Sequence, residues 1–195
     1  MLKDHGPYRV LVRDLPVKRR FEVPAERVAE WLRGMPMRDA LDADIEAGSG
    51  AAELELYGDA DGTTVFVAGE FDGHLAVACS RCIGPVDVAI HETLRVTFLP
   101  RHEMPADAEE EAEGGEGPEV TGEDLDLFPY DGDVVDLEPL LREQFVLAVP
   151  FAPLCAETCK GLCSQCGVDL NTDTCGCEKP IDPRLAVLKG LKIPS

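Results

Sequence analysis

The stretch VDVAIHETLRVTFL, residues 86–99, alternates apolar and polar side chains almost without interruption. Successive side chains of a β-strand point to opposite faces of a sheet, so residues of one parity share a face. The apolar residues of even number are Val86, Val88, Ile90, Leu94, Val96 and Phe98. Only Glu92 breaks this row, which predicts a long strand with one face buried in the core.

Upstream segments alternate in the same way: AELELY at 52–57, TTVFVAGEF at 63–71 and HLAVAC at 74–79. Turn-forming dipeptides separate these segments: Asp61-Gly62, Asp72-Gly73 and Gly84-Pro85. The pattern predicts an antiparallel meander of four strands, which PYRVLVRDLP at 7–16 joins as a first strand.

Two segments have helical periodicity instead. Residues 23–36 begin with a proline near the start and reach Gly34, which predicts a helix that ends there. Residues 133–150 contain Asp136 as a candidate N-cap and an apolar stripe before Pro150. Each helix can lie with its apolar side across the sheet.

The charge is unevenly distributed along the chain. The net charge is −20, and residues 101–143 carry sixteen acidic against two basic residues, whereas residues 1–40 carry nine basic against six acidic ones. Residues 102–131 are rich in Glu, Gly, Pro and Ala and have little apolar area to bury, so they predict an acidic flexible loop. We therefore expect a β-rich core at 1–101, and a packing helix, cysteine-rich tail and short C-terminal helix at 132–195.

Targeting signals and long apolar runs are missing from this sequence. The first sixteen residues contain scattered charges and no apolar segment of a signal peptide, and no run approaches the length of a membrane span. The expected location is the cytoplasm, with no membrane contact. In that reducing compartment, eight clustered cysteines are poor candidates for structural disulfides.

The cysteines have the spacing of metal ligands. Two C-x-x-C pairs, Cys79 with Cys82 and Cys163 with Cys166, are each followed closely by a glycine, which allows the backbone to fold over the sulfurs. The less regular pairs are Cys155 with Cys159, and Cys175 with Cys177. Eight thiolates suit two zinc ions with four ligands each. The expected fold class is thus α+β: an antiparallel β meander packed by one or two helices, with a C-terminal cysteine-rich zinc-binding tail.

Other uses of these thiols fit the context less well. Cys159, Cys163 and Cys166 match the C-x3-C-x2-C spacing with which radical enzymes hold an iron-sulfur cluster. Such an enzyme needs a large barrel after this motif, and the 29 residues after Cys166 leave no room for one. Thiol redox chemistry at Cys79 and Cys82 remains an alternative, although a strand-to-helix junction would suit it better than a following strand. No nucleophile elbow, phosphate loop or carboxylate pair is present in the sequence, so we expect neither an enzyme nor a small-molecule substrate.

Four stretches together resemble one family: ACSRCIGPVDVAI at 78–90, VDLEPLLREQFVLAVP at 135–150, PLCAETCKGLCSQCGVDLNTDTCGCE at 153–178 and DPRLAVLKGLK at 182–192. They are similar to the YceD family, the large ribosomal RNA subunit accumulation proteins. The resemblance implies a role in 23S rRNA accumulation and large-subunit biogenesis without known catalysis. It also favours one site formed by Cys79, Cys82, Cys155 and Cys159, and a second formed by Cys163, Cys166, Cys175 and Cys177.

An acidic chain is repelled by RNA at long range, so contact with a 23S rRNA precursor or an assembly intermediate would have to be local. The candidate RNA-binding residues are Lys18, Arg19, Arg20 and Arg81, with Arg184, Lys189 and Lys192 as further candidates. Arg81 is expected to project from its rigid turn toward a phosphate. The alternative function is an adaptor that binds a basic ribosomal protein without touching RNA, and the acidic loop is either a solvated linker or an attractant for such a protein.

Overall fold

A computed structural model describes residues 6–42, 44–104 and 127–177. Its main element is a five-stranded sheet formed by β2 (Val17–Val23), β3 (Gly48–Gly58), β4 (Val65–Ala78), β5 (Pro85–Pro100) and β6 (Leu127–Tyr130), in this order. A small second sheet pairs β1 (Arg9–Leu11) with β7 (Val134–Asp136). The helices are α1 (Ala25–Trp31), α2 (Pro36–Asp39) and α4 (Glu138–Ala148). This confirms the α+β class with a mostly antiparallel sheet.

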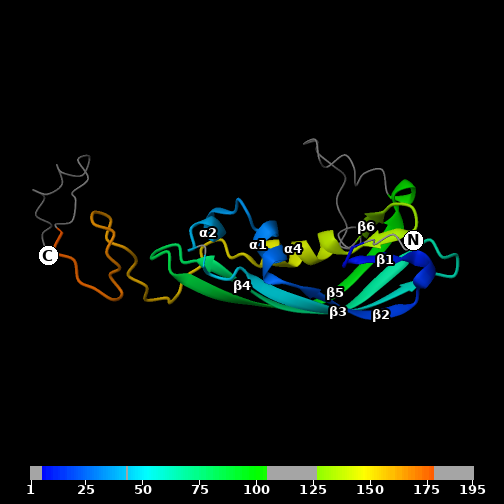
Figure 1. Ribbon diagram of the computed structural model, residues 1–195, viewed down its shortest axis with the longest axis horizontal. Helices are drawn as coiled ribbons and strands as arrows, with labels where there is room; N and C mark the ends of the chain where they lie inside the picture. Colours follow the sequence, from blue (N-terminus) through cyan, green and yellow to red (C-terminus); the bar gives the residue numbers. More distant parts are fainter. Residues whose placement is uncertain (1–5, 43, 105–126, 178–195) are drawn as a thin grey trace, which may run out of the picture.

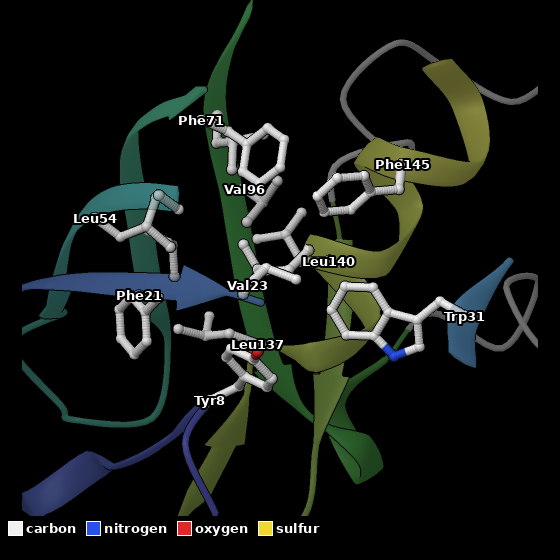
Figure 2. Packing of buried hydrophobic residues seen from close by; sticks show 14 of the residues in the cluster. Tyr8, Phe21, Val23, Trp31, Leu54, Phe71, Val96, Leu137, Leu140 and Phe145 are labelled. Atoms are coloured by element: carbon white, nitrogen blue, oxygen red, sulfur yellow. The ribbon is translucent and has the colours of Figure 1, made fainter. Parts of the chain in front are cut away.

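One face of the sheet is covered by α1 and α4, and no described helix covers the other (Figure 1). The alternation in β5 has the predicted result, because Ile90, Leu94 and Phe98 are buried while His91 between them is exposed. Phe145 of α4 packs between the indole of Trp31 and the ring of Phe71, with ring centroids 5.9 and 5.3 Å away (Figure 2).

The prediction of a turn at Asp72-Gly73 is wrong, because β4 runs through this dipeptide without a break. Asp72 pairs with Ala51 on one side and with His91 on the other. Gly73 permits close packing here, since a Cβ at this position would lie 3.1 Å from the Ser49 carbonyl oxygen. The Asp-Gly dipeptide is typical of a turn, but here its glycine allows β3 and β4 to lie close together.

The prediction that residues 7–16 form the first strand of the meander is also wrong. Residues 9–11 pair with β7 in the small sheet, and the strand next to β3 is the basic segment β2. Three consecutive cations hide the alternation in this segment. The register explains why they are tolerated, since Lys18 lies opposite Glu55, and Arg20 opposite Glu53.

The predicted acidic loop, 102–131, extends too far at its C-terminal end. Residues 127–130 form β6, which pairs in parallel with the last four residues of β5. Tyr130 is buried, and its hydroxyl donates to the carbonyl oxygen of Thr63 at 2.6 Å. Residues 105–126 of this loop lie outside the described residues, as do the expected C-terminal helix and the candidates Arg184, Lys189 and Lys192.

The start of α4 differs by a small shift from the expected capping. The N-cap position is Leu137, not Asp136. The Asp136 carboxylate still accepts from the N–H of Glu138 at 3.0 Å, and it also forms a 2.8 Å ion pair with Arg9. Asp136 thereby joins the helix start to β1.

Candidate metal centres

The eight cysteines gather into two groups of four in which all ligand atoms lie within 4.8 Å of one another. The first group is Cys79, Cys82, Cys155 and Cys159, and the second is Cys163, Cys166, Cys175 and Cys177. This is the grouping that the family resemblance implied. The first group joins two distant parts of the chain, and the second lies within one tail segment.

The sulfur separations suit a shared ion better than covalent bonds. The Sγ atoms lie 3.9 Å apart for Cys79 and Cys159, and 3.6 Å apart for Cys82 and Cys155. A disulfide would need about 2.05 Å. Four sulfurs at about 2.3 Å from a tetrahedral zinc ion are separated by about 3.8 Å. The donor set and its spacing therefore fit a tetrathiolate metal site.

The first knuckle has a compact backbone turn. The N–H of Cys79 donates to the Gly84 carbonyl oxygen at 2.8 Å, and the N–H of Arg81 donates to the Cys79 sulfur at 3.5 Å. The expected role of the glycine is wrong here, because Ile83 rather than Gly84 has the left-handed conformation, with φ of +64°. A side chain in this conformation costs about 1–2 kcal/mol, so the turn is held by its surroundings. In the second knuckle Gly167 has the expected positive φ.

The tail docks on this knuckle through backbone hydrogen bonds as well as through the cysteines. The N–H of Ser80 donates to the Pro153 carbonyl oxygen at 2.8 Å, and the N–H of Leu162 donates to the Arg81 carbonyl oxygen at 3.0 Å. In Figure 1 the tail (orange) lies beyond the end of the sheet that the β4–β5 hairpin forms. The first cysteine group is therefore the junction between sheet and tail.

Arg81 belongs to this junction, a role that its sequence position did not indicate, while its contact with RNA stays a prediction. Its guanidinium donates to the Cys159 carbonyl oxygen at 2.8 Å and to the Glu157 carbonyl oxygen at 3.4 Å. The side chain thus holds the tail against the hairpin. A residue that sequence reasoning missed is Asn171, whose amide donates to the Cys159 sulfur at 3.4 Å and accepts from the Lys160 N–H at 2.8 Å. The sequence contained one signal for this role, an asparagine twelve residues after the ligand Cys159.

One thiol in each group ionises easily. Burial raises the pKa of Cys79, but N–H donors to its sulfur, beginning with that of Arg81, outweigh this effect and lower the pKa to about 6. The backbone N–H groups of Cys166 and Gln165 lower the pKa of Cys163 to about 6. Both groups therefore contain a ready thiolate ligand at neutral pH.

Another thiol in each group is held in its protonated form. The neighbouring side chain of Cys159 contributes most to a Cys155 pKa of about 12, and that of Cys166 to a Cys177 pKa of about 12. Four crowded thiols cannot all carry negative charge unless a cation offsets the repulsion. This is the electrostatic arrangement that a divalent metal ion would stabilise.

A family model described as large ribosomal RNA subunit accumulation protein YceD matches residues 67–192, which include both cysteine groups. The chain belongs to the YceD family. Uncharacterized proteins of Mycobacterium tuberculosis and Mycobacterium leprae are each 29% identical, over 70% and 72% of this chain. The match spans 59% of the length of these relatives. A maize protein named large ribosomal RNA subunit accumulation protein YCED homolog 1, chloroplastic, is 27% identical over 60% of this chain and 45% of its own. No solved structure matches.

The YceD match begins within β4, so it leaves the basic strand β2 outside. The predicted RNA-binding patch also divides in space. Arg19 pairs with Leu54 of β3, which in turn pairs with Gly69 of β4. Gly69 lies nine residues before the end of β4. At about 3.3 Å per residue, Arg81 is about 30 Å or more away, so it cannot form one patch with Lys18 and its neighbours.

None of the described helices of this YceD protein is long and apolar enough to span a membrane.

Gly161 offers a test of the junction, with Gly167 as its control. Both have positive φ, but a Cβ at Gly161 would lie 2.9 Å from the Arg81 carbonyl oxygen, whereas a Cβ at Gly167 would have no neighbour within 4 Å. Gly167→Ala should cost about 1–2 kcal/mol locally. We expect Gly161→Ala to add a steric effect that loosens the tail, measured as faster hydrogen exchange at Ser80 and Leu162. Equal exchange in the two variants would contradict this role.

Proposed function

We propose that this protein is a non-catalytic ribosome-assembly factor of the cytoplasm, needed for 23S rRNA accumulation and large-subunit biogenesis. The observation that carries the proposal is the family match, which spans the sheet-to-tail junction and both cysteine groups. In this proposal the protein binds the 23S rRNA precursor or an assembly intermediate. Its tail serves as a rigid extension of the sheet.

Zinc is the proposed occupant of both cysteine groups. Zinc favours four thiolates in a tetrahedral arrangement, and such closed sites stabilise folds rather than perform catalysis. The first ion would hold the hairpin ligands Cys79 and Cys82 to the tail ligands Cys155 and Cys159. The second would fix the tail itself. The N–H and amide donors to the sulfurs, among them Asn171, would orient the ligands and reduce their charge.

Direct RNA contact is proposed for the outer edge of the sheet at β2. Lys18 and Arg19 are exposed there, and Arg19 lies over the ring of Phe21 at 5.2 Å. Arg20 is less available, because it forms a 3.0 Å ion pair with Glu53. Phosphate contacts at this edge would be few, so binding should depend on both cations and on salt.

The uncovered face of the sheet favours a second candidate function, the binding of a basic ribosomal protein. This face is hollowed by an open groove of about 1020 Å³, which extends from β2 to His91 of β5. Its acidic lining residues are Glu22, Glu53, Glu55, Glu70 and Asp72. Among the described residues that line the groove, Lys18 and Arg20 are the only Lys or Arg side chains that offset this charge. Such a surface attracts Lys-rich and Arg-rich segments and repels phosphates.

The test of the function begins in cells that lack the protein. We expect them to contain less 23S rRNA relative to the small-subunit rRNA, and the wild-type chain should restore the level. Cys82→Ser should fail to restore it, because three remaining ligands leave the first metal site incomplete. Normal 23S rRNA in the deletion strain would overturn the proposal.

Two charge-reversed variants separate RNA contact from protein contact. Lys18→Glu with Arg19→Glu should weaken retention on naked 23S precursor and reduce the salt slope by about 1 for each lost phosphate contact. Glu55→Lys with Glu70→Lys should leave that retention intact and weaken capture of basic ribosomal proteins. If the first variant keeps full RNA retention and the second loses complementation, the adaptor function replaces the RNA-binding one.

A further inference from the structure

Along most of one long edge, the sheet has no partner strand among the described residues. Of the sixteen residues of β5, only Thr97–Pro100 pair with β6 on the outer side. No described residue pairs with that side of β5 from Pro85 to Val96. An edge of this length presents a row of free N–H and C=O groups that can pair with another strand.

The opposite edge of the sheet is protected in a way that β5 is not. The outer strand β2 carries three consecutive cations, Lys18 to Arg20, and charged side chains discourage pairing between edges. The free part of β5 carries charges of both signs at separated positions, with Asp87 near one end and Arg95 near the other. Its composition is therefore compatible with pairing.

A small groove runs beside this edge on the helical side. Its volume is about 290 Å³, and it is lined by Leu94 and Val96 of β5 together with Leu140 and Leu147 of α4. Leu147 is 72% exposed, which is unusual for a leucine that lines a groove next to the core. A strand added to β5 would place alternate side chains into this groove.

We propose that the added strand is β5 of a second copy of this chain, paired antiparallel about His91. In this register Asp87 lies opposite Arg95 of the second copy, and this pair occurs twice. Asp87 and Arg95 are exposed, share one face of the strand, and form no ion pair with another described residue. Pairs of opposite charge directly across an antiparallel ladder are stabilising.

The same register also matches the apolar side chains. Val88 lies opposite Leu94 of the second copy, and Val86 lies opposite Val96. Val86 and Val88 are half-buried and pack at the border of the core. In the paired state they would extend toward the groove of the second copy and cover Leu147. The strand is thus complementary to itself in charge and in hydrophobicity, as a two-fold interface requires.

The experiment is a measurement of mass in solution by analytical ultracentrifugation over a dilution series. We expect twice the monomer mass of 21.1 kDa at high concentration and dissociation on dilution. Asp87→Arg alone, or Arg95→Asp alone, places like charges opposite each other twice. Each should raise the dissociation constant at least about tenfold. Glu26→Arg, a similar charge change at an exposed position of α1, should leave the dissociation constant unchanged.

Mixing the two variants gives the decisive outcome. A dimer that contains one chain of each kind again has two opposite-charge pairs, one in the wild-type arrangement and one with the two charges exchanged, so the mixture should associate like the wild type. A monomer at every concentration would overturn the proposal. So would a dimer that the single variants do not weaken, or a mixture that associates no better than its components.

Discussion

Cys159→Ser is expected to release the tail from the sheet while the sheet remains folded. Cys159 is 4% exposed, and its sulfur lies 3.9 Å from that of Cys79 at the junction. No residue of 150–177, the part of the tail that the structure describes, belongs to the buried core that holds the sheet and helices together, so this segment depends on the first site. Structural zinc supplies on the order of 10 kcal/mol of apparent folding free energy, which makes this the largest effect we expect.

The matched control is Cys175→Ser in the second group, whose sulfur lies 3.3 Å from that of Cys163. Both variants should lose one of two metal equivalents by elemental analysis. Only Cys159→Ser should make residues 155–162 sensitive to limited proteolysis and accelerate exchange at Ser80. If both variants release the tail equally, the two groups act as one unit, and if neither loses metal, the sites do not bind it.

Phe145→Ala is expected to destabilise the fold by about 3–5 kcal/mol. The Phe145 side chain is fully buried and contacts Trp31 of α1 and Phe71 of β4, so its removal leaves a cavity where three elements meet. Because domains of this size are stable by about 5–15 kcal/mol, the loss is a large fraction of the total. The midpoint of urea unfolding should fall accordingly.

Arg142→Ala on the same helix is the control for helix propensity and general truncation. Arg142 is exposed, and substitutions at such positions usually change the free energy of unfolding by less than about 0.5 kcal/mol. A similar midpoint shift in both variants would mean that α4 contributes through its backbone rather than through Phe145. A shift of less than 1 kcal/mol for Phe145→Ala would show that the surrounding core collapses to fill the space.

Sequence patterns correctly predicted the structural features that are determined by residues close together in the chain. The alternation in residues 86–99 identified β5 and its buried face, because the period of two follows from strand geometry alone. The two C-x-x-C knuckles were visible because their turn is built from neighbouring residues. The hairpin at Asp61-Gly62 also formed as expected, with Gly62 at φ of +74° and the Asp59 carboxylate accepting from the N–H of Thr63.

The errors arose at features that are determined by residues far apart in the chain. Asp72-Gly73 has turn composition, but pairing partners on both sides keep it inside β4. The strand β2 was missed because its cations are stabilised by glutamates of β3, which no local pattern reveals. The junction role of Arg81 was missed because the tail carbonyl groups that it contacts lie 76 and 78 positions away. Tertiary contacts of this kind override local preference.

The junction also imposes an order on assembly. Cys82 and Cys155 are 73 positions apart in the chain, whereas Cys163 and Cys175 are only 12 apart. Closing the longer loop costs about 1–2 kcal/mol more in chain entropy, and synthesis at about 5–20 residues per second delays the tail by several seconds. The hairpin thiols must therefore stay reduced while their partners are still being made. A newly synthesised chain is for that interval more sensitive to oxidants than the finished protein.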